Sequence, residues 1–322
     1  MSVMLPGEWV GAEVDARGVS VPGVGNGLLR GEEIAIARRF RVAGGWPYAL
    51  AMLGGTGLWA ASLVLALAGW MPLMAAFVVS TVFCSCSYLF AHESIHHNVF
   101  PRGSRWHWLN EMCGWVALLP MALPFSLARV VHVRHHAHVN DPDADPDFID
   151  DAPSLREAVW RSIVNRQPVG GWRESYRRAC EQVGTRKAAA AGRHAIALGW
   201  LYVAALMIMA WSGHALVAAL VWWLPRHIGL TYGRIYLSWM PHHPRQGRQG
   251  RQERYRSTRV FHSALGDLGS SYMGYHLVHH LYPTIPLHLT KPAYHALRPI
   301  LVARGVDCSA KPARGAGEDQ CS

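Results

Sequence analysis

The chain has 322 residues, of which 51% are hydrophobic and only 16% are charged. A soluble domain averages about a quarter charged residues, so this composition argues against a soluble protein and favours a membrane protein. The net charge of +10 would suit nucleic acid, an anionic membrane surface or an acidic partner, but the long apolar segments argue against nucleic acid.

The first 41 residues precede any apolar run and contain the acidic residues Glu8, Glu13 and Asp15. A secretory signal peptide instead has a basic start that is followed by an apolar stretch. We therefore expect residues 1–41 to be a cytoplasmic N-terminal segment rather than a signal peptide.

The first apolar stretch lies between Arg41 and His92 and contains no Lys, Arg, Asp, Glu or His. Its length of about 50 residues allows two membrane crossings, because one crossing takes about 20 residues. Glycine and proline interrupt it at residues 69–72, where a turn is expected. The pattern predicts a hairpin of two transmembrane helices at about 47–69 and 72–92.

Residues 108–128 are mostly apolar but contain Glu111 and two prolines. If this segment crossed the membrane, the histidines on its two sides would lie on opposite faces. We therefore interpret it as a re-entrant or interfacial element. Further along, residues 154–157 (SLRE) form a capping-box motif, which predicts an amphipathic surface helix as far as Asn165.

A second charge-free stretch, residues 195–225, is interrupted only by Ser212-Gly213-His214. It predicts a second hairpin, with transmembrane helices at about 195–212 and 215–236. Basic residues precede both hairpins, whereas neither hairpin tip has a Lys or Arg, so the positive-inside rule places both termini in the cytoplasm. These basic residues are Arg38, Arg39, Arg41, Arg186, Lys187 and Arg193.

Together these elements predict an all-α, multi-pass protein of the inner (cytoplasmic) membrane. Four transmembrane helices in two hairpins are expected to carry a cytoplasmic helical cap, all within a membrane domain at residues 42–303. Residues 304–322 are expected to form a polar C-terminal tail that frays. The six cysteines form no paired motif, so no disulfide framework is expected.

Histidine is the most distinctive residue of the chain, with 19 copies, many of them in three clusters next to apolar segments. The clusters read HESIHH (92–97), HVRHH (132–136) and HLVHH (276–280), and a lone His242 follows the fourth predicted helix. Residues spaced i, i+3 and i+4 share one face of a helix, so each cluster can direct two or three imidazoles to one point. The predicted metal ligands are His92, His96, His132, His135, His136, His242, His276, His279 and His280.

The number of these histidines predicts two metal ions. One zinc ion takes four ligands in a structural site and three in a catalytic site, so nine imidazoles exceed its needs. Two ions would each keep a position for O2 or water. Imidazole binds Zn, Cu, Fe and Ni, so the spacing does not identify the metal. No catalytic residue beyond the ligands is expected, and His97 fits the helical face less well than His96 does.

Other polar residues near the clusters are expected to support the ligands. Glu93 is expected to orient a ligand, and the acidic run at residues 140–147 is interpreted as a rigid turn whose first residues hydrogen-bond histidines of the second cluster. Six further histidines lack the spacing seen in the clusters, so we expect them to have supporting or structural roles. They are His138, His227, His243, His262, His288 and His295.

At these residues the chain resembles the membrane fatty-acid desaturase and hydroxylase superfamily, which is defined by three such histidine boxes. Within it, the chain is most similar to the cyanobacterial-type carotenoid beta-ring hydroxylases, in HVRHHAHVNDPDADPD (132–147), MPHHP (240–244) and YHLVHHLYPTIP (275–286). The resemblance covers roughly residues 91–299. It implies a di-iron site (Fe2+/Fe3+) with His242 as an extra ligand, four transmembrane helices, and O2-dependent hydroxylation or desaturation of a lipid.

Two positions depart from the family pattern. The family usually has Asn two residues before the third box, where this chain has Gly274. The subfamily usually has Arg after the lone histidine, where this chain has His243. The first change would remove a water-mediated iron contact, so it leaves the coordination number open.

The chemistry also favours iron, because an unactivated C–H bond requires a redox-active metal and zinc has no redox chemistry. The substrate is expected to be a carotenoid or a fatty acyl chain that enters from the bilayer. A separate electron donor, such as a ferredoxin or a b-type cytochrome, is expected because the chain has neither a ferredoxin-type cysteine pattern nor an HPGG haem motif. An arginine-rich face would suit an acidic donor or lipid headgroups equally: Arg173, Arg177, Arg178, Arg245, Arg248, Arg251 and Arg254.

Three alternatives stay open beside carotenoid beta-ring hydroxylation. A fatty acid desaturase, acting on acyl-lipid or acyl-CoA, would use the same boxes. A membrane metal transporter would hold its ligands near the bilayer midplane on broken helices, whereas the apolar helices predicted here hold none. A membrane zinc hydrolase would work without O2.

Overall fold

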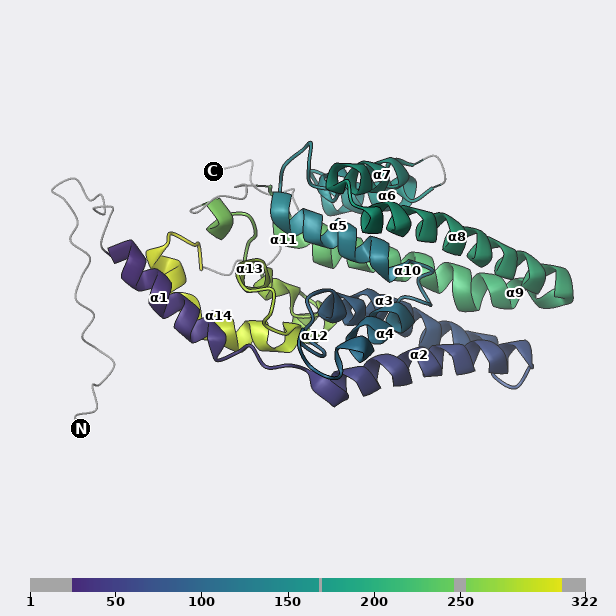
Figure 1. The fold of residues 1–322 in the computed structure, drawn as a ribbon. Helices are drawn as coiled ribbons and strands as arrows, with labels where there is room; N and C mark the ends of the chain where they lie inside the picture. Colours follow the sequence, from purple (N-terminus) through teal and green to yellow (C-terminus); the bar gives the residue numbers. More distant parts are fainter. Residues whose placement is uncertain (1–24, 168–169, 246–252, 309–322) are drawn as a thin grey trace.

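A computed structural model describes residues 25–167, 170–245 and 253–308, and within these ranges the protein is helical with no β-strand. The long helices extend together to one end of the molecule (Figure 1). The first and last helices, α1 and α14, lie at the other end, together with α12 and α13 (Figure 1). The expectation of an all-helical chain is therefore confirmed for the described residues.

The first predicted hairpin is present as α2 (Gly45–Leu67) and α3 (Leu73–Ile95). Both helices are long and apolar enough to cross a membrane. Gly69, in the turn between them, has a φ of 71°, a left-handed conformation that glycine adopts without strain. Large apolar side chains such as Leu58 and Val82 face outward along both helices, as lipid contact requires.

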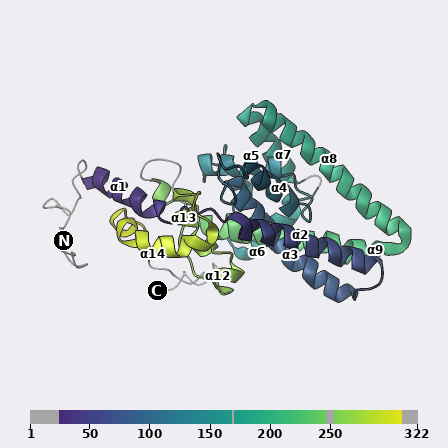
Figure 2. The same cartoon turned by 60° about the horizontal axis from the view of Figure 1, so that its bottom comes forward.

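The third candidate span is one continuous helical run of 57 residues, Arg186–His242, so the described residues contain three candidate spans rather than four. Gly213 interrupts it with a φ of 86°, and the chain reverses direction there (Figures 1 and 2). The run consists of α8 (Arg186–Met209), η2 (Ala210–His214), α9 (Ala215–Val217), η3 (Ala218–Trp223), α10 (Leu224–Gly233), η4 (Arg234–Trp239) and α11 (Met240–His242).

Residues 108–128, the mostly apolar segment with two prolines, do not form a spanning helix. They contribute α4 (His107–Ala117) and the start of α5 (Phe125–His138), which a turn separates. Pro124 directly precedes α5, a position where its missing N–H costs nothing. Neither helix is among the candidate spans.

The helix start predicted at Ser154 is confirmed. The Ser154 hydroxyl accepts a hydrogen bond from the Glu157 backbone N–H at 3.3 Å and so begins α6 (Leu155–Asn165). The short helix η1 (Phe148–Asp150) precedes α6, and α7 (Gly171–Val183) follows it. Helix α7 packs against α5 and α8, so the segment between the two hairpins covers one side of α5.

The C-terminal part of the described chain consists of short helices and one long helix. They are η5 (Glu253–Tyr255), α12 (Gly266–Gly269), η6 (Met273–Tyr275), α13 (His276–Leu281) and α14 (Leu287–Ala303). Helix α1 (Gly25–Arg38) packs against α14, so part of the predicted N-terminal segment belongs to the same helical assembly. Most of the predicted C-terminal tail, residues 309–322, lies outside the described residues.

The most extensive helix contact joins α3 to α10 and thereby links the two hairpins. Gly229 of α10 allows this approach, because a Cβ there would lie only 2.6 Å from the Cys84 carbonyl. The contact holds the end of α3, with its histidines, beside the returning helix that leads to His242.

Candidate metal centre

Four parts of the fold bring the nine predicted ligands together. His92 lies in the last turn of α3 and His96 directly follows that helix. Helix α5 carries the second cluster, α13 carries the third, and His242 is the last residue of α11. The nine histidines form two groups, within each of which one ligand atom per residue lies within 4.8 Å of all the others.

The first group contains five histidines from three elements, α3, α5 and α13. Its Nε2 atoms form a chain of short separations: 3.0 Å between His92 and His279, 2.9 Å between His279 and His136, 3.0 Å between His136 and His132, and 2.8 Å between His132 and His96. Because imidazole nitrogens are good metal ligands, this convergence forms a candidate metal site.

The second group contains His135, His242, His276 and His280. The Nε2 atoms of His276 and His280 lie 3.0 Å apart. The Nε2 atoms of His135 and His242 are buried and have no hydrogen-bond partner within the described part of the chain. Buried polar atoms are normally paired, so these two nitrogens indicate a ligand that they would hold.

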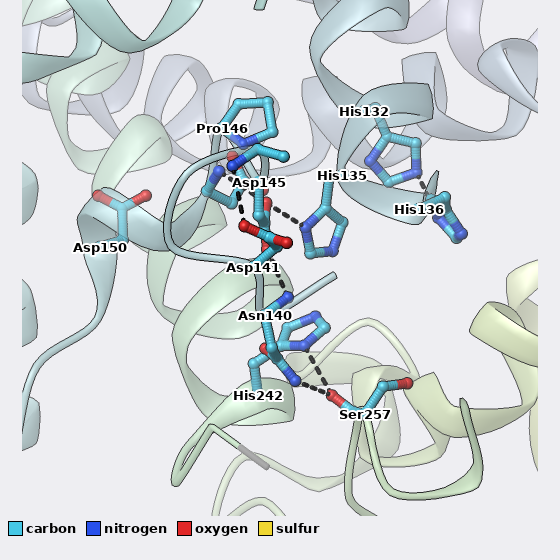
Figure 3. Close-up of polar contacts among 12 residues, drawn as sticks. His132, His135, His136, Asn140, Asp141, Asp145, Pro146, Asp150, His242 and Ser257 are labelled. Atoms are coloured by element: carbon cyan, nitrogen blue, oxygen red, sulfur yellow. Dashed lines mark hydrogen bonds and ion pairs between the residues drawn. The ribbon is translucent and has the colours of Figure 1, made fainter. Parts of the chain in front are cut away.

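The other ring nitrogens of these two histidines are fixed by the protein (Figure 3). His135 Nδ1 lies 2.8 Å from a carboxylate oxygen of Asp145, and His242 Nδ1 lies 3.1 Å from the carbonyl oxygen of Ser257. When Nδ1 donates in both rings, each Nε2 presents its lone pair to the site.

The acidic run therefore supports the site through a later residue than the sequence suggested. The carboxylate that reaches His135 belongs to Asp145, and not to the first residues of the run. The other Asp145 oxygen accepts the Asn140 backbone N–H at 2.9 Å. A carboxylate at this place closes the turn as well as holding the histidine.

The predicted arginine-rich face is wrong for one of its members, Arg245. Arg245 is almost fully buried, 3.5 Å from Asp145 and 3.4 Å from Asp151, and Arg254 donates to the Tyr255 hydroxyl next to buried Glu33. The Arg245 guanidinium is thus enclosed beside the buried Asp145 carboxylate, which needs a counter-charge, whereas the Arg254 side chain stays 31% exposed. Arg177 and Arg178 pair with Glu174 on the surface of α7, Arg173 is exposed, and Arg248 and Arg251 lie outside the described residues.

Glu93 is buried beside the first group, with Oε1 3.6 Å from His92 Nδ1. This separation is longer than a hydrogen bond. The Glu93 carboxylate also accepts from the Leu287 backbone N–H at 3.4 Å and from the Asn98 amide at 3.5 Å. It thus links the end of α3 to the start of α14.

Burial determines the protonation state of most of these histidines. The charged imidazolium is costly to bury, and neighbouring histidines repel it. Burial therefore lowers the pKa of six of these histidines well below the ordinary 6.5. They are His96, His132, His136, His276, His279 and His280. Burial also acts to lower the pKa of His135, but Asp145 outweighs it, so that pKa is raised. Neutral imidazole is the metal-binding form.

The histidines outside the nine have other surroundings. His97 forms a separate group with His107 and Glu111, and its Nε2 accepts from Arg102 at 3.1 Å. His243 stacks on Trp239 with ring centroids 4.7 Å apart. His288 is hydrogen-bonded to the Tyr48 hydroxyl.

Gly274, one of the two departures from the family pattern, has a steric cause. A Cβ at this position would lie 2.5 Å from the carbonyl oxygen of Phe261. The Phe261 backbone N–H also donates to the Gly274 carbonyl at 3.1 Å. An asparagine therefore does not fit here without displacing the backbone just before the third histidine cluster.

A cavity of about 360 Å3 opens beside both groups. His132 of the first group and His135 and His276 of the second line it. Much of the remaining wall is apolar and comes from α5 and α10, whereas the exposed residues Gln167 and Arg173 lie at its rim. No sequence pattern predicts this cavity, since its walls come from segments far apart in the chain.

Two arginines in the cavity wall, Arg234 and Arg226, have partners within the protein. Arg234 of η4 contacts Asp147 and Asp150, each at 2.7 Å, and also the Tyr176 hydroxyl. Arg226 donates to the Met121 carbonyl at 2.6 Å. These two guanidinium groups are therefore hydrogen-bonded within the protein, which lowers the cost of placing an apolar ligand beside them.

Comparison with known proteins gives one family and several relatives. A family model described as fatty acid desaturase matches residues 68–311. The chain is 26% identical over 203 residues to a beta-carotene ketolase of Paracoccus sp., which covers 62% of this chain and 69% of the ketolase. It is 30% identical over 107 residues to an sn-1 oleoyl-lipid 12-desaturase of Picosynechococcus sp., and 28% identical over 102 residues to one of Anabaena variabilis.

The three relatives differ in how much of their length is matched. The alignments cover only 30% and 27% of the two desaturases, and 31% of this chain in each case. The chain therefore spans less than a third of the desaturases, but more than two thirds of the ketolase.

Proposed function

Because the chain belongs to the fatty acid desaturase family and is an oxidoreductase, we propose that it uses O2 and two iron ions to oxidise a C–H bond of a carotenoid, by hydroxylation of the beta ring. The observation that carries this proposal is the apolar cavity, because it reaches histidines of both candidate metal groups. An apolar substrate would reach a reactive centre there without leaving a low-dielectric environment.

The proposed ligands are the nine histidines, five for one ion and four for the other. The five imidazoles of the first group exceed the four ligands of a tetrahedral zinc site, which supports a metal of higher coordination number.

Iron is proposed because the reaction needs a metal that changes its oxidation state, and imidazole suits iron. When bound, the iron pair would supply the electrons that activate O2. The protein's own contribution is to keep most of the imidazoles neutral, to orient His135 and His242 through their Nδ1 atoms, and to exclude water. A separate electron donor, such as a ferredoxin or a b-type cytochrome, is part of the proposal.

The membrane arrangement is proposed to have four crossings, with α8 and the α9–α10 run as the second hairpin. A straight helix of the 57 residues in the third candidate span would be about 85 Å long, far more than the roughly 30 Å of the hydrocarbon core. The reversal at Gly213 supports two crossings instead. The basic residues before each hairpin support a cytoplasmic metal site and cytoplasmic termini in an inner membrane.

The carotenoid is preferred over an acyl chain because the ketolase is matched over most of its length. The local similarity to two oleoyl-lipid desaturases favours acyl-lipid desaturation as a second candidate. Both reactions would use the same cavity and the same histidines.

Expression in a bacterial host that accumulates beta-carotene would test the proposal. We expect new, more polar carotenoids that carry ring hydroxyl groups, identified by mass spectrometry, and about two iron ions per chain, as nine imidazoles suit two sites. His135→Ala should remove the product, whereas His138→Ala, on the same helix but outside both groups, should not. New double bonds in the host lipids with unchanged pigment would instead support the desaturase.

A further inference from the structure

One wall of the cavity is formed by a single face of the α10–η4 run. Gly229, Leu230, Gly233, Leu237 and Ser238 all line the cavity. Their spacings of three and four residues place them on one side of a helix. The facing wall includes Ala128 and Val131 of α5, next to His132 and His135. This part of the cavity is therefore adjacent to the candidate metal centre.

The two glycines in this wall have different surroundings. A Cβ at Gly229 would lie 2.6 Å from the Cys84 backbone, so helix packing accounts for that glycine. A Cβ at Gly233 would have no atom within 4 Å. Neither close packing nor a positive φ explains Gly233, although glycine inside a helix is less favourable than alanine.

We propose that Gly233 is a specificity-determining residue: its missing side chain sets the width of the cavity beside the metal centre, and so the largest substrate end that can enter. Gly233 lies one residue before Arg234, which Asp147 and Asp150 hold in place, so this part of the wall cannot move outward easily. The inference rests on the proposed function, because it takes the cavity to be the substrate site.

The width matters because the two candidate substrates differ in cross-section. A carotenoid ends in a substituted ring, whereas an oleoyl chain is slim. A leucine side chain at position 233 would project into the cavity and exclude the ring before it excludes the chain. Pocket shape of this kind discriminates by about 10- to 200-fold per methylene-sized change.

The first experiment compares Gly233→Ala and Gly233→Leu with Gly199→Leu. Gly199 is a matched control, because it also lies in a membrane helix with no atom within 4 Å of a Cβ, and it does not line the cavity. With metal content unchanged, we expect Gly233→Leu to lower beta-carotene conversion at least about tenfold, Gly233→Ala to lower it less, and Gly199→Leu to leave it unchanged. Wild-type conversion by Gly233→Leu would overturn the inference.

The second experiment needs no catalysis. Gly233→Cys and Gly199→Cys are treated in membranes with a small maleimide, and labelling at each position is measured by peptide mass spectrometry. Protection of position 233 alone by added beta-carotene supports both proposals. Protection by an oleoyl lipid but not by beta-carotene overturns the carotenoid substrate and keeps Gly233 on the substrate path. Absence of protection by either, in an enzyme that still oxidises its substrate, overturns the role of Gly233.

Discussion

Asp145 connects the acidic turn to the candidate metal centre through one side chain. Its carboxylate is fully buried and accepts from His135 Nδ1 and from the backbone N–H groups of Asn140 and Asp147. Arg245 lies 3.5 Å away and balances its charge. A partner of this kind fixes the tautomer and direction of a ligating imidazole and raises its basicity.

Replacement of Asp145 should therefore weaken metal binding at the second group. We expect Asp145→Asn to lower the affinity of that group about 10- to 100-fold, as loss of such a partner typically does. Titration of the metal-free protein with Fe2+ would measure it. Asp143→Asn, in the same turn but exposed, is the control and should bind like the wild type. Equal affinity of the two variants would contradict the role of Asp145.

Acid should destabilise the metal-free protein. At a pH below 6.5, the ordinary histidine pKa, the histidines of the unfolded chain bind protons. The six buried imidazoles with lowered pKa do not bind these protons in the folded protein. The free energy of unfolding therefore falls as the pH falls, although the raised pKa values of His135 and of the Asp150 carboxyl oppose this. We expect a lower melting temperature at about pH 5.5 than at about pH 7.5. An unchanged or higher value at the lower pH would rule this out.

At the scale of elements, α1 is attached to the C-terminal helices by a buried charge. Glu33 is fully buried and accepts hydrogen bonds from the hydroxyls of Tyr255 and Tyr282, both at 2.7 Å. Arg254 and Arg304 lie 3.9 and 3.8 Å from its carboxylate. Tyr282 follows the third histidine cluster by two residues, so α1 stabilises the segment that carries His279 and His280.

Removal of this carboxylate should be costly, because it leaves two buried tyrosine hydroxyls without their acceptor and removes the negative charge beside two guanidinium groups. We expect Glu33→Ala to lower the free energy of unfolding by about 3–5 kcal/mol. The neighbouring Glu32 is exposed, so Glu32→Ala should have almost no effect. Thermal unfolding in detergent would compare the two, and a similar loss in both would show that Glu33 is not the attachment.

At the scale of the whole molecule, the hairpin tips lie far from the metal centre. Trp70 and Trp211 at the two tips are 80% and 95% exposed, and both tips lie at the same end of the molecule (Figures 1 and 2). Tryptophan is enriched at the interfaces between membrane and water, which suits these positions. The candidate ligands lie near the opposite ends of the long helices.

Two hairpins require both tips to face one side of the membrane and α6 to face the other. We expect Trp70→Cys and Ser212→Cys to react with a membrane-impermeant thiol reagent from the periplasmic side. Arg156→Cys, on the exposed surface of α6, should react only from the cytoplasmic side. Reaction of Ser212→Cys and Arg156→Cys from the same side would mean that α8 does not cross the membrane.

Residue patterns within short stretches of the sequence made several helices predictable. The charge-free run before His92 corresponds to α2 and α3, and the motif at Ser154 begins α6 where predicted. The second hairpin was less predictable at its start, since α8 begins at Arg186, nine residues before the predicted residue 195. Thr185 accounts for this start, because its side chain accepts the Ala188 backbone N–H and caps the helix.

The sequence by itself determined the histidine clusters, because helical spacing of i, i+3 and i+4 fixes which imidazoles share a face. Only the tertiary structure divided the nine histidines into groups of five and four, since that division depends on how α3, α5, α11 and α13 meet. The same holds for Asp145 as the partner of His135, for the burial of Glu33 and for the cavity beside Gly233. Each depends on distances between segments far apart in the chain, which local spacing does not encode.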